Sequence, residues 1–228
     1  MDGTVEFYQR VHALLSPEAK VLDFGAGRGA FLDDPVLFRR NLRRLKDSAA
    51  EVIGIDVDES VLENPCLTRA EVIPPGTRLP LPEKSIDLVV ADFVFEHITD
   101  PTWASHELSR VLRPGGWLCA RTPNRWGYIG VGARVLPNRW HTPLLRMFQP
   151  GKQERDTFPT AYRLNSPAAL RKYFPKTDFE HFIYTMNNEP AYFSNWHAVW
   201  ALVRLLFRLT PEALGATMYV FLRKTRSG

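Results

Sequence analysis

The feature of this sequence that most constrains its fold is a glycine-rich segment, VLDFGAGRGAF, at Val21–Phe31. A short apolar run leads into it, and Asp23 is followed by Gly25, Gly27 and Gly29 at alternate positions. Glycines let a backbone turn sharply and approach a ligand with no Cβ in the way. A helix that starts here adds unpaired N–H groups and a partial positive charge, which suit a carboxylate. We therefore predict a strand, a ligand-binding loop and a helix, with Asp23 facing a cationic group.

The loop alone leaves more than one interpretation open. Gly25, Gly27 and Ala30 also fit the G-x-G-x-x-A pattern of a dinucleotide site, and an ordinary tight turn would need similar residues. A loop that binds a carboxylate at the helix start and an ammonium at Asp23 suits an amino-acid-like ligand. The next apolar run ends at Asp56, where an acid can bind both hydroxyls of a ribose. The two features together indicate a nucleoside cofactor.

Strand-like and helical segments alternate along the rest of the chain. We expect strands at Lys20–Phe24, Glu51–Val57, Ala70–Ile73, Ser85–Phe93, Trp117–Arg121, Phe179–Met186 and Thr217–Leu222. We expect helices at Val5–Leu15, Phe31–Ser48, Ser60–Leu62, Thr102–Leu112, Ser166–Phe174 and Trp196–Leu209. Strands separated by helices imply right-handed βαβ units and a mostly parallel sheet.

A length of 228 residues suits one domain over 1–228. We expect a cofactor-binding half at 1–122, a cap or substrate insertion at 123–165, and a part that completes the sheet at 166–228. The insertion is rich in Pro, Gly, Arg and aromatic residues, has no clean period, and is too long for a plain connection.

Four segments, in order, resemble the successive motifs of class I S-adenosylmethionine-dependent methyltransferases of the type 11 group. They are VLDFGAGRGAF, GIDVD, LPLPEKSIDLVVADFVFEHITDP and ELSRVLRPGGWLCARTPN, within Lys20–Asn124. The resemblance implies a Rossmann-like α/β fold: a seven-stranded, mostly parallel sheet with a reversed last strand, helices on both faces and a cap insertion after the fifth strand. It implies S-adenosyl-L-methionine as the cofactor.

The resemblance also implies which residues hold that cofactor. Gly25–Gly29 would hold the methionine end, Asp56 the ribose, and Asp92 and Phe93 would line the site beside the reactive methyl. The expected cofactor-binding set is Asp23, Phe24, Gly25, Ala26, Gly27, Gly29, Asp56, Val57, Asp92 and Phe93. Pro75 stands where the group often has an acid for the adenine amine. We therefore expect that contact from backbone near Gly76 or Thr77, or from elsewhere.

The catalytic candidates follow the fourth expected strand. Methyl transfer is an in-line displacement, so alignment matters most, and an oxygen nucleophile usually also needs its proton removed. His is the side chain most easily poised for that near neutral pH. We predict Glu96 and His97 as the catalytic pair, with Asp92 beside them. The alternative is that Glu96 and His97 only open the following helix. Because Phe93–Phe95 precede them, we expect no metal site.

Arginines and aromatics interleave in and around the insertion, a pattern that can bind phosphate, carboxylate, sugar faces or stacked bases. The predicted substrate-binding residues are Arg121, Asn124, Arg125, Tyr128, Arg139, His141, Tyr162 and Arg163. We expect an acidic small-molecule or glycan-like acceptor, lipid-linked in one version, methylated on a hydroxyl or amine. The alternatives are a self-packed cap and an insertion that lies on a membrane surface.

RNA is the alternative acceptor, favoured by the basic run Arg39–Lys46, which a solvent-exposed helix face explains more simply. DNA is not expected, because ADFV lacks the Asn/Asp-Pro-Pro-aromatic pattern of enzymes that methylate nucleobase amines. A nicotinamide-dependent oxidoreductase is disfavoured by LRPGGW and the long insertion. The intact glycine loop disfavours a catalytically inactive binding module.

We expect a cytoplasmic protein. Met1–Arg10 lacks the apolar region of a signal peptide, no run of about 18 apolar residues occurs, and Cys66 and Cys119 are expected to be reduced. The net charge of +4 and pI near 9.2 are mildly basic, which by itself selects no partner.

Overall fold

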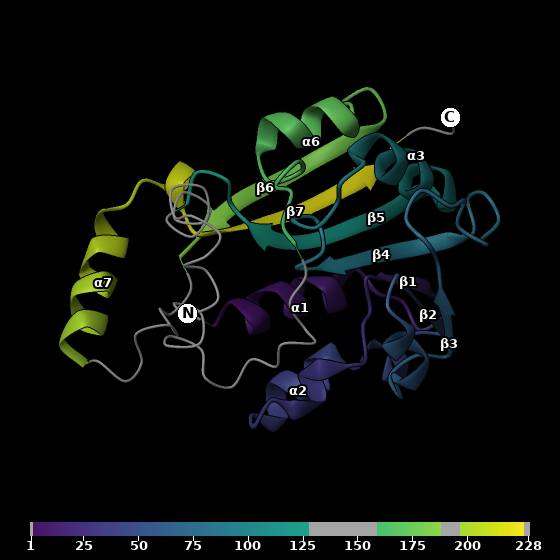
Figure 1. Cartoon of the computed structure of the whole chain (residues 1–228), viewed down its shortest axis with the longest axis horizontal. Helices are drawn as coiled ribbons and strands as arrows, with labels where there is room; N and C mark the ends of the chain where they lie inside the picture. Colours follow the sequence, from purple (N-terminus) through teal and green to yellow (C-terminus); the bar gives the residue numbers. More distant parts are fainter. Residues whose placement is uncertain (1, 128–158, 188–196, 226–228) are drawn as a thin grey trace.

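A computed structural model describes residues 2–127, 159–187 and 197–225 as an α/β fold around a seven-stranded sheet (Figure 1). The order across the sheet is β3-β2-β1-β4-β5-β7-β6, and β7 is antiparallel to both of its neighbours. The strands are β1 Lys20–Phe24, β2 Glu51–Asp56, β3 Arg69–Val72, β4 Ile86–Asp92, β5 Leu112–Pro123, β6 Phe179–Met186 and β7 Thr217–Lys224. The expected fold class, including the reversed last strand, is confirmed.

Helices cover both faces of this sheet, with α3 and α6 on one side and α1 and α2 on the other (Figure 1). The helices are α1 Gly3–Leu14, α2 Leu37–Arg43, α3 Pro101–Val111, α6 Pro167–Tyr173 and α7 His197–Leu209. Ser166 caps α6 as expected, its hydroxyl accepting the Ala169 N–H.

Two apolar clusters follow from the alternation of side chains along the strands. Leu22 and Phe24 of β1 join one cluster with Leu108 of α3, while Val21 joins the other with Phe7 of α1. A strand that is apolar on both faces belongs in the middle of a parallel sheet covered on both sides. The core therefore fixes strand β1, whose carboxyl end leads into the glycine loop.

Two expectations about the elements are wrong. Phe31–Ser48 is not one helix: it is divided into the 3₁₀ turn Ala30–Asp33, helix α2 and a second 3₁₀ turn, Leu45–Asp47. Pro35 lies at the break, where it has no N–H to donate and disfavours a helical residue before it. Strand β5 begins at Leu112 and includes the Pro-Gly-Gly turn, and the register against β4 shifts there.

The strand order reverses at β1, which has β2 on one side and β4 on the other. In open α/β sheets, ligands bind outside the carboxyl ends of the strands at such a point. Thr217, at the start of the antiparallel strand β7, pairs with both Pro123 and Met186, the last residues of β5 and β6. The insertion after β5 and the segment that carries α7 therefore leave from the same edge as the glycine loop.

Candidate functional site

The glycine loop after β1 has the backbone that only glycine adopts easily. Gly25, Gly27 and Gly29 have φ of +77°, +52° and +76°. A Cβ on Gly25 would lie 2.4 Å from Cγ2 of Val94, so this position lets the segment after β4 pack closely. A Cβ on Gly27 would meet nothing within 4 Å. Gly27 therefore faces open space, where a ligand can approach the backbone.

Backbone and side-chain hydrogen bonds fix this loop against β2 and the turn that follows it. The Gly25 N–H donates to the Ile55 carbonyl (2.7 Å), and the Gly27 N–H donates to Oδ2 of Asp56 (2.8 Å). Nδ2 of the buried Asn64 donates to the Gly27 carbonyl (3.0 Å). Sequence reasoning missed Asn64, whose only signal was the Asn-Pro pair at the end of a short helical segment.

Asp56 at the end of β2 is half-buried, and each of its carboxylate oxygens already accepts one backbone hydrogen bond. Oδ2 accepts from Gly27, and Oδ1 accepts from the N–H of Asp58 (3.0 Å). A carboxylate oxygen can accept more than one bond, so both oxygens retain capacity for ribose hydroxyls. Val57 beside it is 53% exposed, as a residue that lines a ligand site can be.

Of the two backbone positions predicted to contact adenine, Thr77 is committed to local structure. Its N–H donates to the Pro74 carbonyl (3.2 Å), and its carbonyl accepts from the indole of Trp103 (3.1 Å). The backbone at Gly76, which has φ of +80°, remains the predicted contact for adenine.

Asp23 lies at the end of β1, and among the described residues no hydrogen bond or ion pair reaches its carboxylate. Burial, followed by the negative charge of Asp92, raises the pKa of Asp23 to about 7, against the opposing effect of Arg43. A half-buried carboxyl group with no partner and a raised pKa is typical of a site that awaits a cation.

Asp92 at the end of β4 is in the opposite situation. It accepts two bonds from Arg121, at 2.7 and 2.8 Å, and its Oδ2 also lies 3.2 Å from both Nη2 of Arg43 and the Tyr8 hydroxyl. Burial alone would raise the pKa of Asp92, but Arg121 and Arg43 bring it below its ordinary value. The carboxylate stays ionised and fully partnered, which favours a positioning role over the predicted catalytic one.

The side chains of two predicted substrate-binding residues are buried and form hydrogen bonds within the protein. Arg121 is 4% exposed, and besides Asp92 it donates to the Thr4 hydroxyl (3.0 Å). Asn124 is 1% exposed, and its Nδ2 donates to the carbonyls of Ala213 and Gly215. These placements correct the prediction, because neither side chain is open to an acceptor.

Phe93 presents an aromatic ring at the tip of β4. It has φ of +59°, unusual for a residue with a side chain, and its N–H donates to the Arg121 carbonyl (2.7 Å). The ring is 40% exposed and lies 4.7 Å from the Arg121 guanidinium. Backbone strain held in place by surrounding contacts often marks a functional site, and the role of Phe93 beside the cofactor stays a prediction.

Glu96 and His97 lie on a turn between β4 and α3, and they do not open the helix. Asp100 caps α3 instead, accepting the N–H groups of Thr102 and Trp103, and Pro101 is its first residue. Nδ1 of His97 lies 2.8 Å from the Pro159 carbonyl oxygen, which can only accept. A neutral His97 therefore carries its proton on Nδ1 and its lone pair on Nε2, the tautomer that can act as a base.

The two ends of the insertion meet beside this turn. The N–H groups of Ala161 and Tyr162 donate to the Glu96 carbonyl, at 2.6 and 3.1 Å, and Oε2 of Glu96 accepts from Thr122 (2.8 Å). From the other end, the Arg125 N–H donates to the Asn165 carbonyl (2.8 Å). The side chains of Arg125 and Arg163 are exposed. Of the predicted acceptor pocket, Tyr128, Arg139 and His141 lie outside the described residues.

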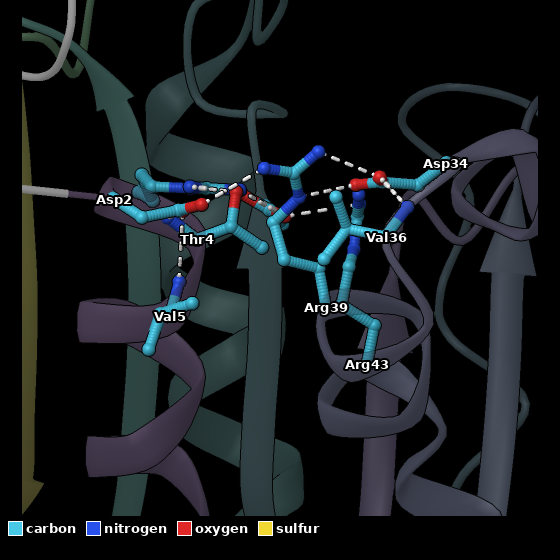
Figure 2. A network of polar contacts seen from close by, with 9 residues as sticks. Asp2, Thr4, Val5, Asp34, Val36, Arg39 and Arg43 are labelled. Carbon is cyan, nitrogen blue, oxygen red and sulfur yellow. Dashed lines mark hydrogen bonds and ion pairs between the residues drawn. The ribbon is translucent and has the colours of Figure 1, made fainter.

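Sequence reasoning also missed the role of α2. Its basic residues were interpreted as a solvent-exposed face, but Arg39 bridges Asp2 (2.9 Å) and Asp34 (2.6 Å), as Figure 2 shows. One turn later, Arg43 contacts Asp92 and stacks 4.8 Å from the Phe31 ring. The network ties α1 to α2 and brings a guanidinium to Asp92 at the end of β4.

Comparison with known proteins gives matches along the part of the chain that carries the site. Residues 22–120, less than half of the chain, match the family model described as a methyltransferase domain. A probable S-adenosylmethionine-dependent methyltransferase from Mycolicibacterium smegmatis is 38% identical over 125 residues, 54% of this chain and 44% of that protein. Another from Mycobacterium tuberculosis H37Rv is 34% identical over 141 residues, 59% and 47%. The match thus spans less than half the length of these relatives.

Solved structures extend the likeness of fold to the whole chain. The YcgJ protein from Bacillus subtilis gives a TM-score of 0.57 at 15% identity and covers 98% of this chain and 99% of its own. A Haloferax volcanii protein, titled a methyltransferase in complex with the activator Trm112, gives 0.61 at 18% identity, covering 99% and 91%. At such identities the likeness concerns the fold alone.

Proposed function

We propose an activity for the whole chain from two findings: residues 22–120 match the methyltransferase-domain family model, and the relatives named above are described as probable S-adenosylmethionine-dependent methyltransferases. It transfers the methyl group of S-adenosyl-L-methionine to a hydroxyl or amine of an acidic small-molecule or glycan-like acceptor. The sulfonium of the cofactor supplies the methyl group. The chain binds the two substrates, aligns them and supplies a base that removes the acceptor's proton.

The observation that carries this proposal is the pairing of two features at the end of β1. Gly27 leaves open space above a backbone of positive φ, and Asp23 offers a carboxylate with no partner among the described residues. The loop suits the cofactor's carboxylate, and Asp23 suits its ammonium. Asp56 keeps hydrogen-bonding capacity for the ribose, and Val57 and Gly76 flank the adenine side.

The acceptor side of the proposal rests on the turn at Glu96 and His97. The tautomer fixed by Pro159 leaves the His97 lone pair on Nε2, which suits removal of an acceptor proton. Ala161 and Tyr162 bond to the Glu96 carbonyl, and in this proposal the exposed side chains of Arg125 and Arg163 bring positive charge to the acceptor. Arginine binds carboxylate and phosphate groups through two parallel bonds, which favours an acidic acceptor.

Calorimetry with S-adenosylmethionine, its demethylated product and NAD tests the cofactor. We expect both sulfur ligands to bind and NAD not to bind. Gly27→Val should abolish binding, because a branched side chain would enter the ligand's space. Gly115→Val is the matched control, since Gly115 also has positive φ and open space around its Cβ direction but lies at the start of β5. Equal binding by the Gly27 and Gly115 variants would remove the loop from the site.

Transfer of a radiolabelled methyl group tests the acceptor, with a uronic acid oligosaccharide, a phosphorylated sugar, a neutral sugar and RNA as probes. We expect labelling of an acidic sugar. Arg163→Ala should lower turnover by about tenfold or more and leave S-adenosylmethionine affinity within about twofold. Arg163→Lys should recover only part of the turnover, because lysine cannot make two parallel bonds. The control is Arg171→Ala, an equally exposed arginine on α6. Labelling of RNA alone would overturn the proposed acceptor.

A further inference from the structure

Helix α7 carries an apolar face that the described part of the chain leaves open. Leu202, Leu205, Leu206 and Leu209 recur at the i, i+3, i+4 and i+7 spacing of one helix face. Their exposed fractions are 56%, 54%, 52% and 73%. Leucines at this spacing normally face a protein core, and a contiguous exposed set marks a binding surface.

The two charged side chains that the structure describes on α7 itself are both arginines, and the nearest acids in the sequence are Glu189 and Glu212. Arg204 and Arg208 lie one turn apart and are exposed, and the sequence from 190 to 211 contains no Asp or Glu. The Arg204 guanidinium lies 4.7 Å from the Trp200 ring. A helix with leucines on one face and arginines with an aromatic residue on the opposite face matches the chemistry of an acyl layer below anionic lipid headgroups.

The described part of α7 has 13 residues, against the roughly 20 that a spanning helix needs. None of the helices in the described ranges is both long and apolar enough to span a membrane.

The sheet topology places α7 at the same edge as the candidate site. It connects the end of β6 with the start of β7, and these two ends pair with each other at Met186 and Thr217. Asn187 ties the end of the helix to this edge by donating to the Phe207 carbonyl (3.5 Å). Figure 1 shows α7 standing beyond the sheet, apart from α1, α3 and α6.

We propose that α7 is an interfacial helix: it lies in the headgroup region of an anionic bilayer, with the four leucines towards the acyl chains and the two arginines at the phosphates. The lipid binding rests on α7 alone. A second step rests on the proposed function: because α7 and the site share an edge, the acceptor reaches the site from the membrane and is attached to lipid.

Co-sedimentation with vesicles tests the proposal, using phosphatidylcholine alone and phosphatidylcholine with about one third phosphatidylglycerol. We expect binding to the anionic vesicles and a loss of roughly tenfold or more in partitioning for the double variant Leu205→Glu/Leu209→Glu. The matched control is Leu62→Glu, since Leu62 is 62% exposed on the 3₁₀ turn Glu59–Glu63, far from α7 in the sequence. Arg204→Gln/Arg208→Gln should weaken binding to the anionic vesicles by roughly tenfold.

Equal binding to both kinds of vesicle, or equal loss in the Leu62 variant, would overturn the proposal. Sedimentation velocity without lipid gives a further decisive result. A dimer that the leucine double variant converts to monomers, with no vesicle binding, would make this face a contact between two copies of the chain. Calorimetry with S-adenosylmethionine on the same variants separates the two proposals, because α7 variants should keep cofactor affinity whether or not they bind lipid.

Discussion

Two neighbouring strands each carry an aspartate near the carboxyl end, and the environments of the two carboxylates are opposite. At the end of β1, Asp23 has no partner among the described residues and a pKa raised to about 7. At the end of β4, Asp92 accepts from Arg121, Arg43 and Tyr8, and its pKa is lowered. The comparison separates a carboxylate kept for a ligand from one used to build the site.

The difference follows from what packs over each strand end. Three glycines follow Asp23 and bring no side chains to it, so its environment is left to a ligand. Asp92 is covered by α1 and α2, which contribute Tyr8 and Arg43, while Arg121 comes from the adjacent strand β5. Asp92 in turn fixes Arg121, whose carbonyl and guanidinium hold the strained residue Phe93. The carboxyl ends of β1 and β4 thus carry one aspartate without a partner among the described residues and one that is fully partnered.

The largest effect is expected at the partnered carboxylate. Asp92→Ala leaves the buried Arg121, and Arg43 beside it, without their anion, and should lower the free energy of unfolding by about 3–5 kcal/mol. Urea denaturation measures this. Glu180→Ala is the control, because the Glu180–Arg223 pair is about half exposed and should contribute less than about 1 kcal/mol.

A double variant tests the cause of this loss of stability. Replacing Arg121 by Met in the Asp92→Ala background removes one of the stranded charges and should recover part of the lost stability. If the double variant is no more stable than Asp92→Ala, the stranded Arg121 charge is not the cause. Equal losses for Asp92→Ala and Glu180→Ala would mean that the two carboxylates at the strand ends do not differ as described.

The sequence was sufficient to predict the position of Asp23, but it did not predict the partners of Asp92. Asp23 belongs to a local pattern in which strand, acid and glycines are consecutive, so its position follows from a few residues. The partners of Asp92 come from α1, α2 and β5, and Tyr8 is 84 positions away. Spacing along the chain carries no information about such contacts, which arise only when the helices pack on the sheet. Arg43 was therefore interpreted as solvent-exposed.

The same limit explains the acceptor side. The sequence predicted Glu96 and His97 from their place after a strand, and left open whether they start the next helix. The Asp100 cap, which removes that alternative, was visible as an Asp-Pro pair. By contrast, Arg121 and Asn124 were assigned to a pocket by residue type alone, and their burial depends on β7 and on the segment before it.

Asp56 on β2 tests an intermediate case, a carboxylate with one bond at each oxygen. Asp56→Ala should weaken S-adenosylmethionine binding by about 1.5–3 kcal/mol, because charge-assisted bonds to the ribose and the bond that holds the Gly27 N–H are both lost. Calorimetry measures the loss. Asp58→Ala is the control, since Asp58 only caps the next 3₁₀ turn through Ser60. Unchanged affinity in Asp56→Ala would remove this residue from the ribose site.

The most specific effect concerns the pH dependence of Asp23. Its pKa of about 7 lies above the ordinary 3.8, so between these values the folded chain holds a proton that the unfolded chain has lost. The contribution of Asp23 to the free energy of unfolding should therefore fall as pH rises from about 4 to about 7, by up to about 1.4 kcal/mol per pH unit. Asp92 acts in the opposite sense, because its lowered pKa gives stability that is lost as pH falls. Asp23→Asn isolates the first contribution.

Cofactor affinity should show the reverse slope at Asp23. Only the ionised carboxylate attracts the ammonium of S-adenosylmethionine, so affinity should rise by up to about tenfold per pH unit from about pH 5.5 to 7, where an α-amino group is still charged. Asp23→Asn should bind more weakly at pH 7 and lose this slope, while Asp58→Ala should keep it. If the stability difference between the unaltered protein and Asp23→Asn does not fall as pH rises, or if the affinity slope persists in Asp23→Asn, then Asp23 does not face the ammonium.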